Sequence, residues 1–272
     1  MKRLTLSDDK IKAAVVMRNG EILAEADNTD KLYPQYSITK SLVSLCIGML
    51  IDDGRLSLKS TVGEILGTPA GEPLSSVTLE ELLTMRSGLN TELLFADRRT
   101  CPDYLAACFS QKTGEKTAFY NNADAYLAGR MAEEVYGKPL ENLMISRIFK
   151  PLGITEFEFE HDPQRHFFGA SGLMLTTRDL AKLGNSICTQ ELYPKTYLEL
   201  ATHTQTRINT TGYGYFFWTG RTSFYMSGKW GQKCFVYPER AAVIAINSDN
   251  TDVLPTLYQE LLPIVGGLDY GV

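Results

Sequence analysis

Histidine is scarce in this sequence, and the common histidine-based catalytic motifs are missing. Its three histidines, His161, His166 and His203, have no metal-ligand spacing, and we expect them on the surface or in loops. GxSxG, HExxH, GxGxxG and the phosphate-binding P-loop are absent as well. The sequence therefore gives no support to α/β-hydrolase, zinc-protease or nucleotide-binding chemistry, and it argues against a Ser-His-Asp triad.

Paired cysteines and long apolar runs are also lacking. The five cysteines are scattered without a CxxC spacing, which favours free thiols in a reducing compartment: Cys46, Cys101, Cys108, Cys188 and Cys234. No apolar stretch follows the basic residues at the start, and the longest apolar run, 42–51, is shorter than a membrane span. We therefore expect a cytoplasmic protein without a membrane partner or a metal site.

The chain carries no strong charge of either sign. Its 27 Lys and Arg against 32 Asp and Glu give a net charge of −5, which provides no electrostatic reason to expect a nucleic-acid partner. A length of 272 residues with 44% hydrophobic residues is sufficient for a sizeable core. No repeat or Gly-, Ser- or Pro-rich linker divides the chain, and the oligomeric state is left open.

The two ends of the chain have the patterns of β-strands, whereas the middle is mainly helical. Residues 12–18 and 21–26 flank Asn19-Gly20, a strong signal for a β-hairpin. Strands are also predicted at 213–218, 222–227, 232–237 and 241–247, before a last helix at 252–265. The predicted fold is α+β, with one antiparallel sheet from residues 1–55 and 205–272 and an inserted helical region, 56–204.

Two further patterns refine this prediction. Residues 37–53 predict a helix that Gly54 ends, and its apolar residues from Leu42 onward indicate a buried, central position. Capping patterns at Thr78-x-x-Glu81 and Thr176-x-x-Asp179 predict the start of two helices in the middle region.

The first candidate for chemistry is Ser37-Ile38-Thr39-Lys40. Positions i and i+3 share a helix face, so Lys40 can reach the Ser37 hydroxyl at the positive end of the helix. Burial and that positive end would lower the pKa of Lys40 and make a neutral amine base accessible. The spacing alone is weak, because Ser7-Asp8-Asp9-Lys10 also matches it, and an N-cap serine beside a surface lysine is the alternative.

The second candidate is Tyr120-Asn121-Asn122, the one Y-x-N among 14 tyrosines. A phenol near a positive lysine can have a lowered pKa and shuttle a proton, and Asn122 can donate to a substrate carbonyl. Taken singly, Tyr120 is an aromatic residue at the edge of the core and Asn122 a turn former.

The third candidate is the segment Gly228-Lys229-Trp230-Gly231-Gln232, which we place at the start of a strand. Glycines beside a lysine suggest that another group approaches the backbone closely, and an exposed N–H there would complete an oxyanion hole. A plain hairpin turn is the alternative.

In this order, the three motifs resemble those of the serine β-lactamase and penicillin-binding-protein superfamily, in its class C-like branch. That branch includes class C β-lactamases, D-alanyl-D-alanine carboxypeptidases and β-lactamase-like esterases. The resemblance covers nearly the whole chain. It is carried by residues 36–62, which resemble the nucleophile helix, 77–89, which end in the SGL turn, and 119–140, which resemble the tyrosine-motif helix, together with PLGI at 151–154, 169–184 and YGYFFW at 213–218.

The resemblance implies a β-lactamase-like fold and a role for each motif residue. Ser37 is the implied nucleophile, Lys40 and Tyr120 the base system, and Asn122 a substrate contact. Lys229 and Gly231 fall on the family's lysine-threonine-glycine strand, and the N–H groups of Ser37 and Gln232 are the implied oxyanion donors.

Trp230 departs from the family pattern, because it stands where β-lactamases usually have threonine. As neighbours on a strand, Lys229 and Trp230 are expected to point to opposite sides. An indole cannot hold a β-lactam carboxylate as a hydroxyl does, so an apolar subsite is favoured. The chain is also smaller than typical class C β-lactamases.

The sequence therefore predicts a serine hydrolase that acts on a small ester or amide through an acyl-enzyme, without metal or cofactor. One alternative is a D-alanyl or D-amino-acid carboxypeptidase, or a weak β-lactamase. Another, from a different class, is a penicillin-binding or sensor module that acylates without turnover. The expected partner is a small-molecule ester, amide or β-lactam.

Overall fold

The computed structural model describes residues 1–68, 71–89 and 101–266. Among them, a nine-stranded sheet has the order β1-β3-β2-β12-β11-β10-β9-β8-β7. Its strands are β1 (Lys2–Arg3), β2 (Ile11–Arg18), β3 (Glu21–Glu25), β7 (Thr206–Ile208), β8 (Thr211–Tyr213), β9 (Trp218–Thr219), β10 (Phe224–Gly228), β11 (Gln232–Tyr237) and β12 (Ala242–Ser248).

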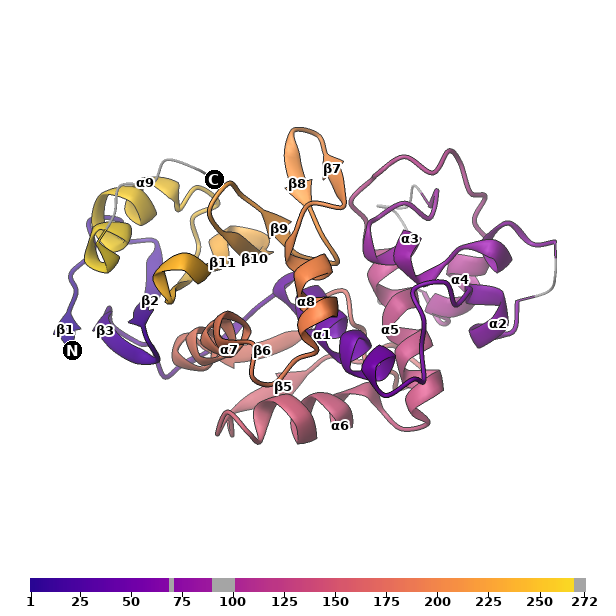
Figure 1. The fold of residues 1–272 in the computed structure, drawn as a ribbon, viewed down its shortest axis with the longest axis horizontal. Coiled ribbons are helices and arrows are strands. Elements are labelled where there is room, and N and C mark those ends of the chain that lie inside the picture. The colour runs from indigo at the N-terminus through magenta and orange to yellow at the C-terminus, as the bar shows by residue number, and fades with distance from the viewer. Residues whose placement is uncertain (69–70, 90–100, 267–272) are drawn as a thin grey trace.

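Both ends of the chain build this sheet, as the sequence predicts. The last strand, β12, pairs antiparallel with β2 on one side and with β11 on the other. The β2–β3 hairpin turns at Asn19 and Gly20, which both have positive φ (51° and 78°), as a two-residue hairpin turn requires. Figure 1 shows the N-terminal and C-terminal strands side by side at one end of the molecule.

The helix that carries Ser37 and Lys40 is central. Helix α1 (Ile38–Asp52) buries every residue from Ile38 to Leu50, because its apolar residues extend round the helix. Asp53 is its C-cap, and Gly54 follows with φ +69°, where the sequence predicts the end of the helix. Burial on all sides fixes α1, and with it the positions of Ser37 and Lys40.

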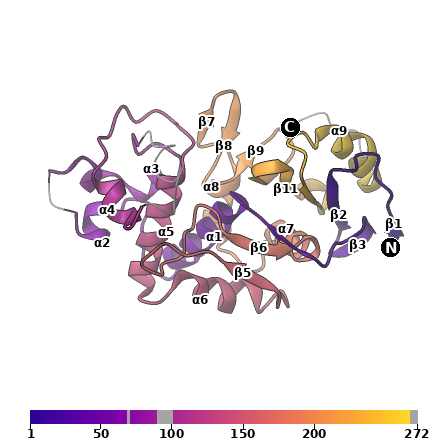
Figure 2. The ribbon, with the colours of Figure 1, turned by 180° about the vertical axis from the view of Figure 1, so that it is seen from behind.

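The remaining helices lie mainly in the middle of the chain. They are α2 (Val62–Leu66), α3 (Leu79–Leu83), α4 (Tyr104–Phe109), α5 (Asn122–Tyr136), α6 (Leu140–Met144), α7 (Thr177–Thr189) and α8 (Lys195–Thr202). The predicted caps are present: Thr78 and Glu81 form a full capping box, and Thr176 accepts a hydrogen bond from the Asp179 N–H. Figure 2 shows α2 to α5 gathered at the end of the molecule opposite the termini.

The chain also contains three short strands that the sequence pattern does not reveal. β4 (Leu32–Pro34), β6 (Leu173–Thr176) and β5 (Phe157–Phe159) form a three-stranded sheet in the order β4-β6-β5. These strands have only three or four residues, and β4 pairs with β6, which is far from it in the sequence. Their pairing is therefore a product of tertiary packing rather than of local periodicity.

Two predicted elements differ from the structure. The strand expected at 213–218 is interrupted, since β8 ends at Tyr213 and β9 begins at Trp218. Gly214 lies so close to the backbone of α8 that a Cβ there would be 2.0 Å from the Ala201 oxygen. The helix expected at 252–265 is split into α9 (Leu254–Thr256), a π-turn at 257–261 and a 3-10 turn at 262–265. Pro263 lacks the N–H that a continuous α-helix needs there.

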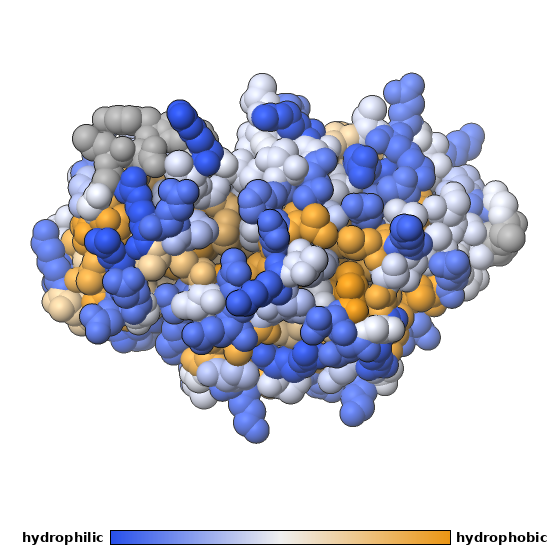
Figure 3. All heavy atoms as spheres, viewed as in Figure 1, coloured by the Kyte–Doolittle hydropathy of each residue, from blue (hydrophilic) through white to orange (hydrophobic). Residues whose placement is uncertain are grey.

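The nine-stranded sheet has a hydrophobic core on each face, and alternate residues of β11 point into one core or the other. Cys234 and Val236 belong to the core beneath α1 and α7, whereas Phe235 and Tyr237 belong to the core beneath the C-terminal segment. In Figure 3, hydrophilic residues predominate on the face shown, with apolar residues between them in the middle. No helix among the described residues has the length and apolarity that crossing a membrane needs.

Candidate active site

Ser37 sits where the chain leaves the small sheet and enters α1. Just before it, the Gln35 N–H donates to the Leu173 oxygen, and Tyr36 turns the chain with φ +47°. Ser37 then occupies the N-cap of α1, but its side chain makes no capping hydrogen bond. The hydroxyl is thus left for Lys40, one turn along the helix, rather than being used as a cap.

Lys40 is buried (1% exposed) and surrounded by three oxygen atoms. Its Nζ lies 2.9 Å from the Ser37 Oγ, 2.8 Å from the Asn122 Oδ1 and 2.7 Å from the Ala170 backbone oxygen. Burial lowers the pKa of Lys40 from 10.5 to about 7, as the sequence analysis expects in direction.

These three neighbours fit both protonation states of the lysine. The ammonium has three N–H donors, one for each oxygen, including the Ser37 Oγ. When Lys40 is neutral, its two N–H donors match the Asn122 and Ala170 oxygens, which can only accept, and its lone pair faces the Ser37 hydroxyl. A lysine with a pKa of about 7 and this arrangement is competent to accept the Ser37 proton at neutral pH.

Tyr120 lies beside Lys40, but its pKa is not lowered as the sequence analysis expected. The Lys40 Nζ is 5.1 Å from the centroid of the Tyr120 ring. Burial raises the pKa of Tyr120 to about 12, and a hydrogen bond to the Ser37 side chain only partly offsets this effect. The expectation was wrong because burial disfavours the charged forms of both groups, so the phenol stays protonated.

Asn122 is the first residue of α5, and the structure places it at the centre of this group. Its Oδ1 is held by Lys40 at 2.8 Å, while the preceding residue, Asn121, caps α5 by accepting from the Asp124 N–H at 2.8 Å. The cap fixes the start of α5 and therefore the position of Asn122. A contact between Asn122 and a substrate carbonyl stays a prediction.

The segment from Gly228 to Gln232 is the hairpin turn between β10 and β11, and the predicted strand begins only at its last residue, Gln232. Residues 229–231 connect β10 to β11, and Trp230 has a left-handed backbone with φ +61°. The Lys229 Nζ lies 4.8 Å from the Trp230 ring centroid, so the two side chains do not point to opposite sides. Alternation holds only along an extended strand, and the turn ends it.

The expected close backbone approach is nevertheless present at Gly228. A Cβ there would be 2.3 Å from the Gln35 oxygen, so the turn lies against the segment that leads into Ser37. Gly231 is different, because its Cβ would be 2.0 Å from the Asn250 oxygen. Gly231 thus packs the turn onto the segment after β12, and its predicted role at the oxyanion is not tested by this contact.

The Gln232 side chain belongs to a buried amide network that the sequence analysis did not predict. Its Nε2 donates to the Lys229 and Ser248 oxygens (3.0 and 2.8 Å), and its Oε1 accepts from the Asn247 Nδ2 at 2.9 Å. The Asn247 Nδ2 also lies 3.5 Å from the Gln35 Oε1. The network therefore joins the hairpin turn to the segment before Ser37.

Part of β10 has a free edge beside this turn. β9 pairs only with Phe224 and Tyr225, and in the described part of the chain Met226–Gly228 have no strand partner on that side. Backbone groups on an unpaired edge are open to a ligand. That the backbone N–H groups of Ser37 and Gln232 donate to an oxyanion remains a prediction.

An aromatic stack extends from Tyr120, in the candidate catalytic group, along the sheet. The Trp218 ring lies 5.5 Å from that of Tyr120 at an interplanar angle of 27°, and 6.4 Å from that of Tyr225 at 15°. The sequence analysis took Trp218 as part of a strand and missed this contact. The one sequence feature that could have drawn attention to Trp218 is that the chain has only two tryptophans.

Asp124 is a second residue that the sequence analysis missed. It is fully buried in the first turn of α5 and accepts a 2.5 Å hydrogen bond from the Ser87 hydroxyl. Burial raises the pKa of this carboxyl to about 7, with the Ser87 and Asn121 hydrogen bonds acting in the opposite direction. Asp124 thus ties the SGL turn at residues 87–89 to the start of α5.

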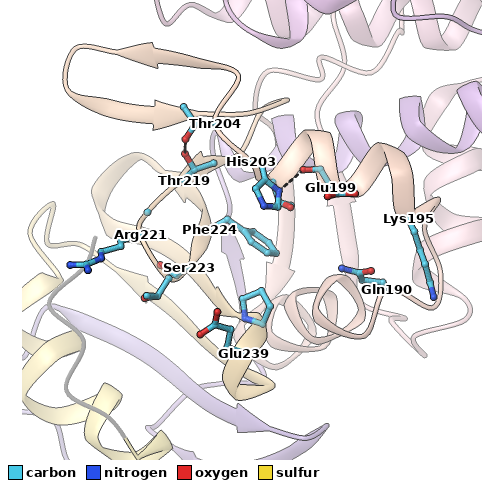
Figure 4. Close-up of a pocket in the computed structure, with 14 residues that line it drawn as sticks. Gln190, Lys195, Glu199, His203, Thr204, Thr219, Arg221, Ser223, Phe224 and Glu239 are labelled. Atoms are coloured by element: carbon cyan, nitrogen blue, oxygen red, sulfur yellow. Dashed lines mark hydrogen bonds between the residues drawn. The ribbon is translucent and has the colours of Figure 1, made fainter.

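A pocket of about 580 Å³ lies at the other end of β10, between α8 and the β9–β10 connection. Figure 4 shows His203, Glu199 and Phe224 among its lining residues, and none of the candidate catalytic residues lines it. The His203 Nδ1 lies 2.7 Å from the Glu199 backbone oxygen, and His203 is exposed as expected. Within the described ranges, no cluster of three His, Cys, Asp or Glu could hold a metal ion.

Comparison with known proteins identifies the architecture. The family model described as Beta-lactamase matches residues 12–256. A D-stereospecific amidohydrolase from Streptomyces sp. superposes with a TM-score of 0.75 at 18% identity, over 94% of this chain and 95% of that one. A beta-lactamase from Mycobacterium bovis (0.71, 18%, 94% and 92%) and a penicillin binding protein from Bacillus halodurans (0.71, 17%, 89% and 93%) share the fold.

Proposed function

Because the chain belongs to the Beta-lactamase family, a family of hydrolases, we propose that it is a serine hydrolase that cleaves a small ester or amide through an acyl-Ser37 intermediate. The observation that carries this proposal is the contact between the Lys40 Nζ and the Ser37 Oγ at 2.9 Å, made by a buried lysine with a pKa of about 7. A lysine of ordinary pKa would be protonated at neutral pH and could not act as a base.

In the proposed acylation, the neutral Lys40 amine takes the Ser37 proton while the Ser37 Oγ attacks the substrate carbonyl carbon. The new C–O bond gives a tetrahedral oxyanion at the N-terminal end of α1, where the helix dipole favours negative charge. The bond to the leaving alcohol or amine then breaks, and that group takes a proton. Water attacks the acyl-Ser37 ester in the second half-reaction and releases the acid.

Tyr120 has the properties of a proton donor in this scheme. A phenol with a pKa of about 12 is protonated at neutral pH, so it cannot be the resting base. Its hydrogen bond to Ser37 and its position beside Lys40 suit the delivery of a proton to the leaving group. Lys40 is therefore the proposed base, and Tyr120 passes the proton on.

Intact-protein mass spectrometry tests this proposal. Wild type is treated with a fluorophosphonate, p-nitrophenyl acetate and a penicillin, and turnover is followed in parallel. Ser37→Ala is expected to abolish labelling and turnover, at a cost of several orders of magnitude in rate. Ser7→Ala is the matched control, because Ser7 has the same spacing to a lysine but its Oγ donates to Glu260 at 2.6 Å.

Two results would contradict the proposal. Fluorophosphonate labelling that persists in Ser37→Ala would place the nucleophile elsewhere. A stable acyl adduct on wild type without product release would favour the non-turnover penicillin-binding or sensor module instead.

A further inference from the structure

The pocket of about 580 Å³ between α8 and the β9–β10 connection has no part in the catalytic scheme. One of its walls is a single face of α8. Lys195, Glu199, Thr202 and His203 all line the pocket, and their spacing of i, i+4, i+7 and i+8 places them on the same side of the helix. Helix α8 therefore presents a polar face to a cavity.

The opposite wall comes from the turns at one end of the sheet. Arg221 belongs to the turn between β9 and β10, and Glu239 to the turn between β11 and β12, and both are exposed. Figure 4 shows these two residues across the pocket from Lys195 and Glu199. Each wall thus carries one cation and one carboxylate, and the four charges add to zero.

These polar groups are available to a ligand. Among the described residues, none of the four charged side chains takes part in an ion pair. The His203 Nδ1 lies 2.7 Å from the Glu199 backbone oxygen, and this oxygen can only accept, so Nδ1 carries the hydrogen. In the neutral ring, the Nε2 of His203 is therefore left as an acceptor.

Two hydroxyl residues of the lining have buried oxygens without a partner. The Thr222 Oγ1 and the Ser223 Oγ make no hydrogen bond within the part of the chain that the structure describes, and Ser223 is only 6% exposed. A buried hydroxyl without a partner is costly, so a ligand that hydrogen-bonds to it gains free energy. Next to them, Phe224 lines the pocket with a small apolar patch.

We propose that this pocket is a binding site for a small neutral carbohydrate, of the size of a monosaccharide or disaccharide. Its volume is in the usual range of small-molecule sites. A ligand with a net charge would be attracted by one charged residue of each wall and repelled by the other. Sugar hydroxyls both donate and accept, so they suit carboxylates and cations alike, and the C–H groups of a sugar ring suit the patch at Phe224. The proposal does not depend on hydrolysis at Ser37.

Backbone amide NMR of the whole chain tests the site. The probes are glucose, cellobiose, maltose and lactose, with glutarate as a dicarboxylate and glycylglycine as a zwitterion at the same millimolar concentrations. At least one of the saccharides is expected to shift the amides of residues 195–204 and 219–224, and to leave those around Ser37 and Lys40 unchanged.

Two variants of opposite charge test the class of ligand. Arg221→Ala and Glu239→Ala are each expected to weaken saccharide binding about threefold to tenfold in an NMR titration, because a neutral ligand hydrogen-bonds to both residues. Lys138→Ala and Glu134→Ala make the same changes of net charge at exposed positions outside the pocket, and they should bind as wild type does.

Three results would overturn the proposal. One is that no saccharide of the panel shifts these residues, and a second is that the shifts appear around Ser37 instead. The third is that a probe bound in the pocket is weakened by Arg221→Ala but strengthened by Glu239→Ala, because the site would then hold an anion. None of these measurements uses turnover, so a failure here leaves the hydrolase proposal to its own test by labelling of Ser37.

Discussion

Replacing Asn122 with aspartate tests whether Lys40 acts as a neutral base. Asn122→Asp keeps the shape of the side chain and puts a carboxylate 2.8 Å from the Lys40 Nζ. In wild type, burial lowers the pKa of Lys40 from 10.5 to about 7, which corresponds to roughly 5 kcal/mol of disfavoured charge. An opposite charge at hydrogen-bond distance favours the ammonium and raises the pKa by roughly one to three units.

The expected result is a displaced pH profile rather than a uniform loss. Wild-type kcat/KM for a neutral ester rises with pH and levels off above about 7, where Lys40 is neutral. In Asn122→Asp the inflection moves to roughly pH 8 to 10, so activity at pH 7 falls roughly five- to five-hundredfold and recovers at high pH. The pKa of Tyr120, about 12, lies beyond this range and adds no second inflection.

The assay measures kcat/KM for p-nitrophenyl acetate and the rate of fluorophosphonate labelling from pH 5 to pH 10. Asn209→Asp, at an exposed turn residue, makes the same change of net charge away from Lys40 and should reproduce the wild-type profile. A wild-type profile without an inflection between pH 6 and pH 8 would refute the neutral-base argument. So would an Asn122→Asp profile that is lowered equally at every pH, because this result would indicate a lost substrate contact alone.

Three further predictions concern the proton transfer, a buried carboxyl in α5 and the turn between β10 and β11. Lys40→Ala and Tyr120→Phe should each remove most activity, and the double mutant should be little worse than either, since the pair transfers one proton; losses that multiply would contradict this. Asp124 has a folded pKa of about 7 against about 3.9 unfolded, so its contribution to stability is present below pH 4 and is lost as the pH rises to 7. Urea unfolding of Asp124→Asn should therefore lack on the order of 4 kcal/mol of pH dependence between pH 4 and pH 8. If the half-exposed Trp230 indole contacts the substrate, Trp230→Thr should lower kcat/KM for short-chain esters by an amount equivalent to roughly 1–3 kcal/mol. An unchanged kcat/KM would indicate that the Trp230 side chain serves packing alone.

Local sequence patterns determined the elements that carry the candidate site. The Ser37-x-x-Lys40 spacing, the apolar run after it and Gly54 predict the helix and put the two side chains on one face. The Asn19-Gly20 pair predicts the hairpin that begins the sheet. These features depend on residues a few positions apart, whose relative geometry is set by the backbone of one helix or one turn.

The turn from Gly228 to Gln232 shows where local pattern becomes insufficient. Its glycines correctly indicated that another segment approaches the backbone closely, but they did not indicate which segment of the chain this is. Only the fold places Gly228 against Gln35 and Gly231 against Asn250. The left-handed backbone of Trp230 likewise follows from closure of the hairpin, and it brought the Trp230 ring to Lys229 against the strand alternation that the sequence suggested.

The electrostatics of the site were decided by the tertiary structure alone. Lys40 meets Asn122 and Ala170, which are 82 and 130 residues away in the sequence, and burial there lowers its pKa to about 7. Tyr120 was expected to have a lowered pKa beside a positive lysine, but the same burial raises it to about 12. The sequence determined which groups are available, because the types and spacing of residues are local. Desolvation depends on every atom packed around a group, so only the folded chain determined that the pKa of Lys40 is lowered and that of Tyr120 is raised.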